Sequence, residues 1–373
     1  MFVIPLLVSS SCREEFMPDV EKYDNLLVVD GMITNEPGPY TIRLSRSSNV
    51  NKPDYNPLPD CHVILHEKEG SSEVLKEAEP GVYKTDSSGI RGQAGKSYKL
   101  EINTPDGDHY ESDFIPMQPP VPIDTVEAEL QYRETNKYSR PLGGYQFYLS
   151  AAPAEQGDSY FLWKLEETYQ YRSEFRIHMI YRGMGIENFP NRDSLYTCWK
   201  TQDVPQIFVG STKGLTSSKI DHEPIHYINT ETKRLQVRYS LLVKQYSINS
   251  SAYSHWKAIK EQVAGDDFLF SSQPYQIRGN IYNTDNHNEA VLGFFTVGSV
   301  SKKRFFFNRP DAEFFYNTCV PNPDLMALAY TPPEEFPVYL THTDEGTAFA
   351  SDYCFDCTLW GGVLEKPDFW VDE

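Results

Sequence analysis

Two histidines separated by three residues form the most obvious candidate for chemistry in this sequence. The segment His222-Glu-Pro-Ile-His226 matches the H-E-x-x-H pattern, in which one helix brings both histidines to a zinc ion and the glutamate acts as a base. Pro224 opposes that use, because a proline inside a helix removes a hydrogen bond and clashes with the preceding turn. The chain from Leu235 onward has the pattern of a strand. We therefore predict that this pair binds no metal and that the protein is not a metalloprotease.

Five cysteines follow the first dozen residues, so at least one of them is unpaired. Cys61 precedes an alternating strand pattern, and we expect it to be free. The other four, Cys198, Cys319, Cys354 and Cys357, are the disulfide candidates, and the sequence does not rank their three possible pairings. Residues 354–357 match C-x-x-C without the βαβ context of a redox motif. A four-cysteine zinc site is disfavoured because two of the cysteines are isolated.

Other motifs with chemical potential are incomplete. The sequence contains no G-x-S-x-G element and no glycine-rich phosphate loop. Residues 283–289 carry oxygen-bearing side chains but lack the glycine of a calcium loop, so a polar turn between strands is the simpler interpretation. Trp163 and Trp199 are candidates for stacking on sugar rings or for the core. No catalytic residue, metal site or cofactor is predicted, and we expect the protein not to be an enzyme.

The first 12 residues have the order of a bacterial lipoprotein signal. Apolar residues 4–8 are followed by three serines and then Cys12. We expect residues 1–12 to be a signal peptide, with Cys12 acylated and residues 13–24 acting as a tether. The alternative is a hydrophobic N-terminal strand with an incidental cysteine. The apolar run is too short to span a bilayer, which takes about 20 residues.

Composition excludes one class of partner and favours one class of fold. The 373-residue chain has a formal charge of −19 and 14% aromatic residues. Such an anionic chain repels phosphate backbones, so we predict no nucleic-acid partner. Tyrosine, phenylalanine and tryptophan pack well on strands, and the chain is therefore predicted to be mainly β.

Strand and turn signals divide the chain into two domains. Residues 25–115 show short alternating strands punctuated by glycine and proline, which is typical of a β-sandwich. Residues 116–124 form a proline-rich linker. Residues 125–373 are predicted to be a larger β-rich domain. Its predicted strands are 146–150, 160–165, 235–245, 275–282, 290–297 and 304–307.

One helix is predicted in the second domain. It begins after a cap supplied by Asn249, Ser250 or Ser251 and ends at Gly265. Its apolar residues recur with a period near 3.6, as expected for an amphipathic helix. We expect this stripe to cover the β core, and a partner-binding face is the alternative. The stripe consists of Ala252, Trp256, Ile259 and Val263.

The C-terminal segment, residues 356–370, combines a cysteine with three large aromatic residues. Burying one such aromatic side chain contributes roughly 1.5–3 kcal/mol. We therefore expect this segment to be packed, although chain ends often fray. The alternative is an exposed docking peptide.

Several short segments together resemble one protein family. They are Val29–Thr34, Gly38–Ser45, Glu79–Tyr83, Arg238–Gln245, Arg278–Ile281, Val291–Phe295, Asp356–Gly362 and Lys366–Trp370. The chain, from about residue 24 to its C-terminus, is similar to the family of domain of unknown function 4249, which comprises uncharacterised lipoproteins of Bacteroidota. The resemblance implies an outer-membrane lipoprotein encoded beside TonB-dependent transporters, and it supplies no catalytic residues. The N-terminal sandwich also resembles the immunoglobulin-like carboxypeptidase-regulatory-like domain.

Two classes of function follow from these expectations. In the first, a lipid-anchored protein on the outer membrane binds a nutrient ligand of unknown class or docks on a β-barrel transporter. In the second, it is a structural or assembly subunit of a larger outer-membrane complex with no small ligand. An undetected hydrolase is a third, weaker class. A concave aromatic pocket in the second domain favours the first class, and a flat apolar patch favours the second.

Overall fold

The computed structural model describes residues 25–48, 54–153, 157–265, 277–316 and 319–372. As predicted, these residues are mainly β, and α1 (Ser250–Gly265) is the one α-helix among them. Within the described part of the chain, no helix is long and apolar enough to cross a membrane. The predicted signal peptide, its Cys12 and the tether of residues 13–24 lie outside the described residues.

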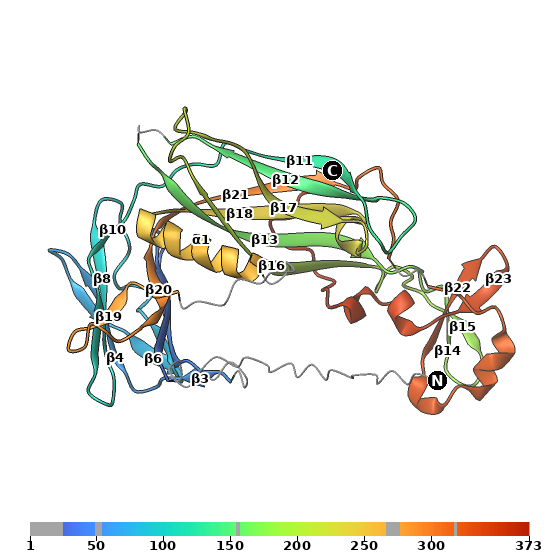
Figure 1. The fold of residues 1–373 in the computed structure, drawn as a ribbon. Coiled ribbons are helices and arrows are strands. Elements are labelled where there is room, and N and C mark those ends of the chain that lie inside the picture. Colours follow the sequence, from blue (N-terminus) through green and yellow to red (C-terminus); the bar gives the residue numbers. More distant parts are fainter. Residues whose placement is uncertain (1–24, 49–53, 154–156, 266–276, 317–318, 373) are drawn as a thin grey trace, which may run out of the picture. The chain divides into compact units, whose positions relative to one another are not determined.

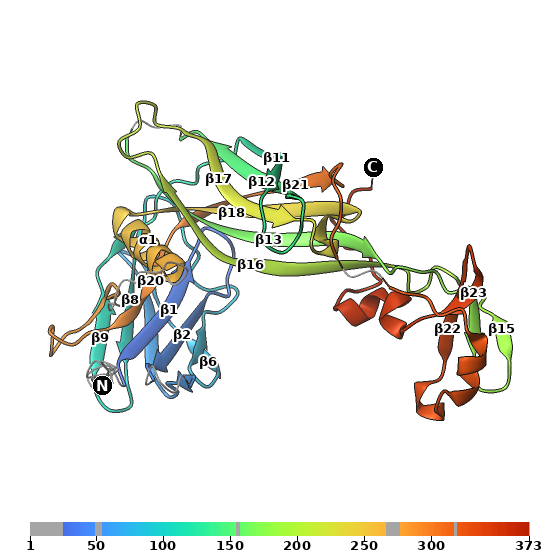
Figure 2. The same ribbon diagram turned by 45° about the vertical axis from the view of Figure 1, so that its right-hand side comes forward.

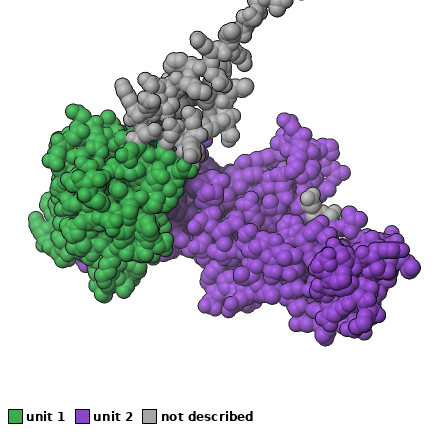
Figure 3. Space-filling view, turned by 90° about the horizontal axis from the view of Figure 1, so that it is seen from below, with its two compact units in different colours: residues 1–92, 96–115, 274–297 green, residues 93–95, 116–273, 298–373 purple. Residues whose placement is uncertain are grey.

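The chain forms two compact units, which Figure 3 colours separately. Unit 1 comprises residues 1–92, 96–115 and 274–297. Unit 2 comprises residues 93–95, 116–273 and 298–373. The sequence alone assigned residues 274–297 to the C-terminal domain, whereas the structure places them in unit 1.

Unit 1 contains two six-stranded sheets, which face each other as two layers (Figure 1). The first has the order β20 (Leu292–Val297), β1 (Leu27–Ile33), β2 (Thr41–Arg46), β7 (Val82–Lys84) and β6 (Lys76–Glu79), with β3 (Asn56–Pro57) paired to β2. The second has the order β19 (Ile281–Asn283), β9 (His109–Ser112), β8 (Ser97–Asn103), β4 (His62–Glu67) and β5 (Ser72–Val74), with β10 (Ile115–Pro116) paired to β8.

Strands β19 and β20 explain why the predicted domain boundary differs from the one in the structure. β20 pairs in parallel with β1, and β19 pairs antiparallel with β9. An alternating pattern predicts a strand but carries no information about a partner more than 150 residues away. The predicted strand 275–282 is shorter in the structure, where it begins at Ile281.

The larger part of unit 2 is a second β-sandwich. One sheet has the order β11 (Thr125–Arg133), β12 (Leu142–Ala151) and β17 (Ile220–Asn229). The other has the order β16 (Thr197–Ser211), β13 (Tyr160–Arg172), β18 (Arg238–Ile248) and β21 (Ser299–Asn308). The two sheets form separate layers in both ribbon views (Figures 1 and 2).

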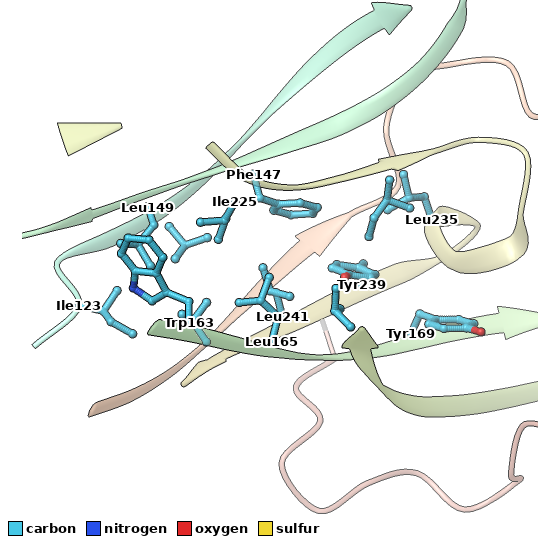
Figure 4. Close-up of a cluster of buried hydrophobic side chains, with 14 of the residues drawn as sticks. Ile123, Phe147, Leu149, Trp163, Leu165, Tyr169, Ile225, Leu235, Tyr239 and Leu241 are labelled. Atoms are coloured by element: carbon cyan, nitrogen blue, oxygen red, sulfur yellow. The ribbon is translucent and has the colours of Figure 1, made fainter. Parts of the chain in front are cut away.

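The core of this sandwich lies between the two sheets. Figure 4 shows Phe147, Leu149 and Ile225 pointing from one sheet toward side chains of the other. The opposing side chains include Trp163 and Leu241, and all five are at most 4% exposed. Burying each of these side chains contributes roughly 1.5–3 kcal/mol, which holds the layers together.

A third sheet of unit 2 has the order β15 (Ile186–Asn188), β14 (Met179–Tyr181), β22 (Val338–Thr343) and β23 (Gly346–Phe349). Five short 3-10 helices complete the described part of this unit: η2 (Lys233–Leu235), η3 (Leu325–Tyr330), η4 (Pro333–Glu335), η5 (Asp352–Cys354) and η6 (Cys357–Trp360). The predicted strand from Leu235 begins later, at Arg238, because Leu235 belongs to η2.

The predicted helix forms with one change in its buried face. The Asn249 side chain accepts a hydrogen bond from the Ala252 backbone N–H at 2.8 Å and caps the helix, as expected. The helix contacts β13 and β16, so it covers the β core. Val263 is 67% exposed, whereas His255 is buried. The apolar stripe therefore turns away from the core in the last helical turn.

Two disulfides tie the C-terminal region to unit 2. Cys198 bonds to Cys357 and Cys319 bonds to Cys354, while Cys61 is free and buried. The two cysteines of the C-x-x-C motif therefore bond to different partners, which agrees with a structural role. Trp370 is 5% exposed. Trp360 and Phe369 are 40% and 39% exposed, so Cys357 and Trp370 fix the C-terminal segment, which is packed only in part.

Candidate functional site

The H-E-x-x-H segment is a strand, as the proline indicated. It lies in β17, where two irregularities in the pairing with β12 interrupt the alternation of side chains. Because of these bulges, His222 and His226 do not share a face. His222 is 47% exposed and stacks on Tyr148 with ring centroids 3.8 Å apart. His226 is 8% exposed and points into the sandwich. The structure therefore separates the two histidines.

A buried glutamate on β13 organises the interior near His226. Trp163, Leu165, Glu167, Tyr169 and Tyr171 occupy alternate positions of this strand and are all buried. Alternate residues of a strand point to the same face. Glu167 therefore replaces an apolar residue in the middle of a core row, and its side chain is 1% exposed. Sequence reasoning missed this residue, although a carboxylate in phase with four apolar residues was the available signal.

Three donors from three elements satisfy the Glu167 carboxylate. Gln202 on β16 donates to Oε1, and the Tyr239 hydroxyl on β18 donates to Oε2 at 2.9 Å. The Arg234 guanidinium, on η2, lies 3.2 Å from Oε1. The register places Gln202 directly opposite Glu167, so pairing of β13 with β16 aligns the donor with the carboxylate. A buried charge needs such partners to offset its desolvation.

These contacts set the ionisation of the carboxyl group. Burial by itself raises the pKa of Glu167, but contacts with His226, Arg234, Gln202 and Tyr239 outweigh it and hold that pKa below its usual value of 4.5. Burial and the neighbouring Glu167 charge raise the pKa of Tyr239 well above its usual value. Glu167 is therefore an anion in the folded protein at neutral pH, and Tyr239 remains a neutral donor.

His226 leaves one polar atom without a partner. Its Nε2 lies 3.9 Å from Oε2 of Glu167, which is beyond hydrogen-bond distance. This buried atom has no hydrogen-bond partner, and neither does the buried Tyr227 hydroxyl. A buried polar group left unpaired costs about 1–3 kcal/mol. The two side chains point to opposite faces of the sheet, because they are consecutive on β17, so only the Nε2 of His226 is on the core face and able to accept or donate a bond to a bound molecule there.

His226 and Tyr227 both border a pocket of about 770 Å³ within unit 2, and the Tyr227 ring itself stacks with Arg133, which is not a residue of the pocket. This volume lies in the range of sites for small ligands. Glu167 and Gln202 also line it, and the aromatic residues around them come from several elements. Those aromatic residues are Tyr138, Tyr169, Tyr171, Tyr227, Phe315, Tyr316 and Trp360. The site is thus concave and aromatic, with polar groups that converge on it.

Lys233 is the buried cation of this pocket. Its ammonium donates to the backbone carbonyl of Arg172 at 3.1 Å and lies 5.0 Å from the ring centroid of Trp360 and 5.6 Å from that of Tyr316. Burial lowers the pKa of Lys233. A cation among aromatic faces is attracted to their π electrons.

None of the remaining sequence candidates lines this pocket. Trp163 is 1% exposed, and its Nε1 donates to Gln245 at 2.8 Å, so it belongs to the core. Trp199 is only partly buried and is not among the pocket residues. Asn283 Oδ1 accepts bonds from the backbone N–H groups of residues 285 and 286, which makes that segment a polar turn. Among the described residues, no group of three or more His, Cys, Asp or Glu is placed to hold a metal ion.

Comparison with known protein families identifies the chain. The sequence model of the domain of unknown function DUF4249 matches residues 13–304. The protein belongs to this family. The match ends well before the C-terminus, whereas the resemblance seen in the sequence segments runs to the C-terminus. Within this DUF4249 protein, Glu167, His226 and Lys233 lie inside the matched region. A search of curated proteins found no match.

Proposed function

We propose that this DUF4249 protein is a surface lipoprotein of the outer membrane that captures a small polar ligand and serves as the binding accessory of a TonB-dependent transporter. In this proposal, acylated Cys12 anchors the chain and unit 2 holds the ligand. The aromatic pocket with the buried His226 Nε2 unpaired carries the proposal. A binding role without catalysis agrees with the carboxylate chemistry, because Glu167 is fully engaged by protein donors.

Two histidines on β17 provide a matched pair of variants for the test. His226→Ala removes the unpaired atom in the pocket, whereas His222→Ala changes an exposed ring outside it. The purified full chain is heated with the low-molecular-weight fraction of the growth medium. Because a ligand that binds only the folded state raises the melting temperature, wild type and His222→Ala should be stabilised and His226→Ala should not. Equal stabilisation of all three would refute ligand capture in this pocket.

The transporter partnership needs a separate measurement. Tagged protein with its complete signal peptide is cross-linked in cells and purified from solubilised outer membrane. We expect a TonB-dependent barrel to co-purify with wild type and with both histidine variants, because each variant changes only one side chain of β17. Recovery of assembly factors without any transporter would favour the alternative function.

That alternative is a structural or assembly subunit with no small ligand. Exposed apolar residues on and after the β14–β15 hairpin favour it. Met184 is 100% exposed, and Met326 and Tyr330 on η3 are 76% and 87% exposed. Exposed apolar surface often marks contacts with other proteins. The pocket makes ligand capture the better-supported function.

A further inference from the structure

Four cations and two carboxylates line the unit 2 pocket, and the carboxylates are already engaged. Glu231 pairs with Lys137 at 2.9 Å, and Glu167 pairs with Arg234 at 3.2 Å. Within each pair, the two opposite charges neutralise each other. The remaining cations are Lys200 and Lys233. The pocket is therefore positive within a chain whose formal charge is −19.

Neither remaining lysine forms an ion pair with a described carboxylate. Lys200 donates to the backbone carbonyl of Trp360 at 3.2 Å, and Lys233 donates to the backbone carbonyl of Arg172 at 3.1 Å. Each ammonium has three donor hydrogens, so both retain donors for a ligand. Lys233 also lies near the ring of Trp360, so both lysines are placed around this one residue.

The uncharged groups of the pocket suit a ligand rich in hydroxyl groups. Trp360 is 40% exposed, so part of its indole is available for stacking on a flat ring. His226 Nε2 is buried and unpaired, and Gln206 adds an amide to the lining. Such groups bind hydroxyls and leave an entirely apolar ligand poorly matched.

We propose that the ligand is an acidic sugar, a hydroxyl-bearing ring that carries a carboxylate. Its carboxylate binds Lys200 and Lys233, its ring packs on Trp360, and its hydroxyls pair with His226 and Gln206. This assignment rests on the proposed capture function and names the ligand class. The two ammonium groups without a carboxylate partner indicate that the ligand is an anion, because a neutral sugar would leave both without an anionic partner.

Titration calorimetry on the full chain tests this assignment with three probes. They are the trimer of galacturonic acid, the neutral trimer of galactose, and benzoate, which carries a carboxylate on a ring without hydroxyls. We expect the acidic trimer to bind at least about ten-fold more tightly than either of the others, since one charge-assisted contact is worth that much. Added salt should weaken the binding of the acidic trimer and leave that of the neutral trimer unchanged, because salt screens the charge of the acidic trimer.

Lysine variants show whether these residues provide the preference. Lys200→Met and Lys233→Met keep an unbranched side chain and remove the charge, while Lys213→Met changes an exposed lysine outside the pocket. Each pocket variant should reduce affinity for the acidic trimer about ten-fold and leave the neutral trimer within two-fold. Lys213→Met should change neither. If Lys233→Met does not fold, the partly exposed Lys200 decides the question.

The outcomes separate this assignment from the function on which it rests. Equal affinity for the two trimers, or benzoate binding as tightly as the acidic trimer, would overturn the acidic-sugar assignment and leave ligand capture standing. An acidic preference that persists in both lysine variants would overturn it too. Absence of binding by all three probes would also overturn it, and the His226→Ala thermal measurement would still decide whether the pocket captures a ligand.

Discussion

Replacing the buried carboxylate Glu167 with an amide tests whether the pocket is built around a charge. Glu167→Gln keeps the shape of the side chain but removes the anion that Gln202, Tyr239 and Arg234 surround. Breaking a buried ion pair by removing one partner costs roughly 3–5 kcal/mol. The amide retains one accepting oxygen, so we expect a loss of about 3 kcal/mol in the free energy of unfolding.

The adjacent residue on the same strand provides the control. Glu166 points to the opposite face, is 22% exposed, and pairs with Lys244 at 3.1 Å and Arg304 at 2.8 Å. Partly exposed pairs contribute about 1 kcal/mol or less. Glu166→Gln should therefore cost much less than Glu167→Gln, although both variants remove one charge from β13.

The five tryptophans, Trp163, Trp199, Trp256, Trp360 and Trp370, all belong to unit 2. Their fluorescence during urea unfolding therefore reports on the unit that contains Glu167. The unfolding midpoint and slope at pH 7 give the free-energy difference between each variant and wild type.

The pH dependence gives a second, independent result. The pKa of Glu167 is lower in the folded protein than its usual value of 4.5, so the folded state binds fewer protons than the unfolded state in this range. The stabilisation is complete above about pH 5 and is lost as the pH falls through the folded pKa. The difference between wild type and Glu167→Gln should therefore be constant above pH 5 and shrink below 4.5. A cost no larger than that of Glu166→Gln, or a difference unchanged down to pH 3.5, would refute the reasoning.

Two further predictions concern the cysteines. The double variant Cys198→Ala/Cys357→Ala opens a loop of 159 residues, and chain-entropy reasoning gives a loss of up to about 5 kcal/mol. Tryptophan-monitored unfolding measures this loss, and a variant as stable as wild type would show that the bond does not stabilise the folded protein. Cys12→Ala, expressed with the complete signal peptide, should move the protein from the detergent phase to the soluble fraction. Continued partitioning into detergent would exclude acylation of this cysteine.

The sequence was sufficient for elements whose signal is local. The short alternating strands predicted within residues 25–115 include β2 and β4, the predicted strand 146–150 lies in β12, and the capping Asn249 marked the start of α1. It was insufficient for pairing, because β1 takes β20 as its parallel neighbour from the far end of the chain. Strand alternation specifies which side chains are buried and leaves open which strand covers them.

The candidate site shows the same limit at the level of side chains. The H-E-x-x-H pattern suggests that its two histidines act together on one ligand. Bulges in β17 leave only His226 inside the pocket. Glu167 could have been noted as a charge within an apolar row. Its partners could not, because Gln202, Arg234 and Tyr239 come from three other elements. A local pattern can thus mark a buried charge but cannot show what neutralises it.

The disulfide between Cys198 and Cys357 connects the stability of unit 2 to its pocket. Cys198 precedes Lys200 on β16, and Cys357 begins η6, which ends at Trp360. The bond therefore holds a pocket lysine and a pocket tryptophan together, and the Lys200 ammonium donates to the Trp360 carbonyl at 3.2 Å. Trp360 lies beyond residue 304, where the family match ends. Part of the pocket wall is thus supplied by a segment outside the matched region, and the Cys198–Cys357 bond holds that segment against β16.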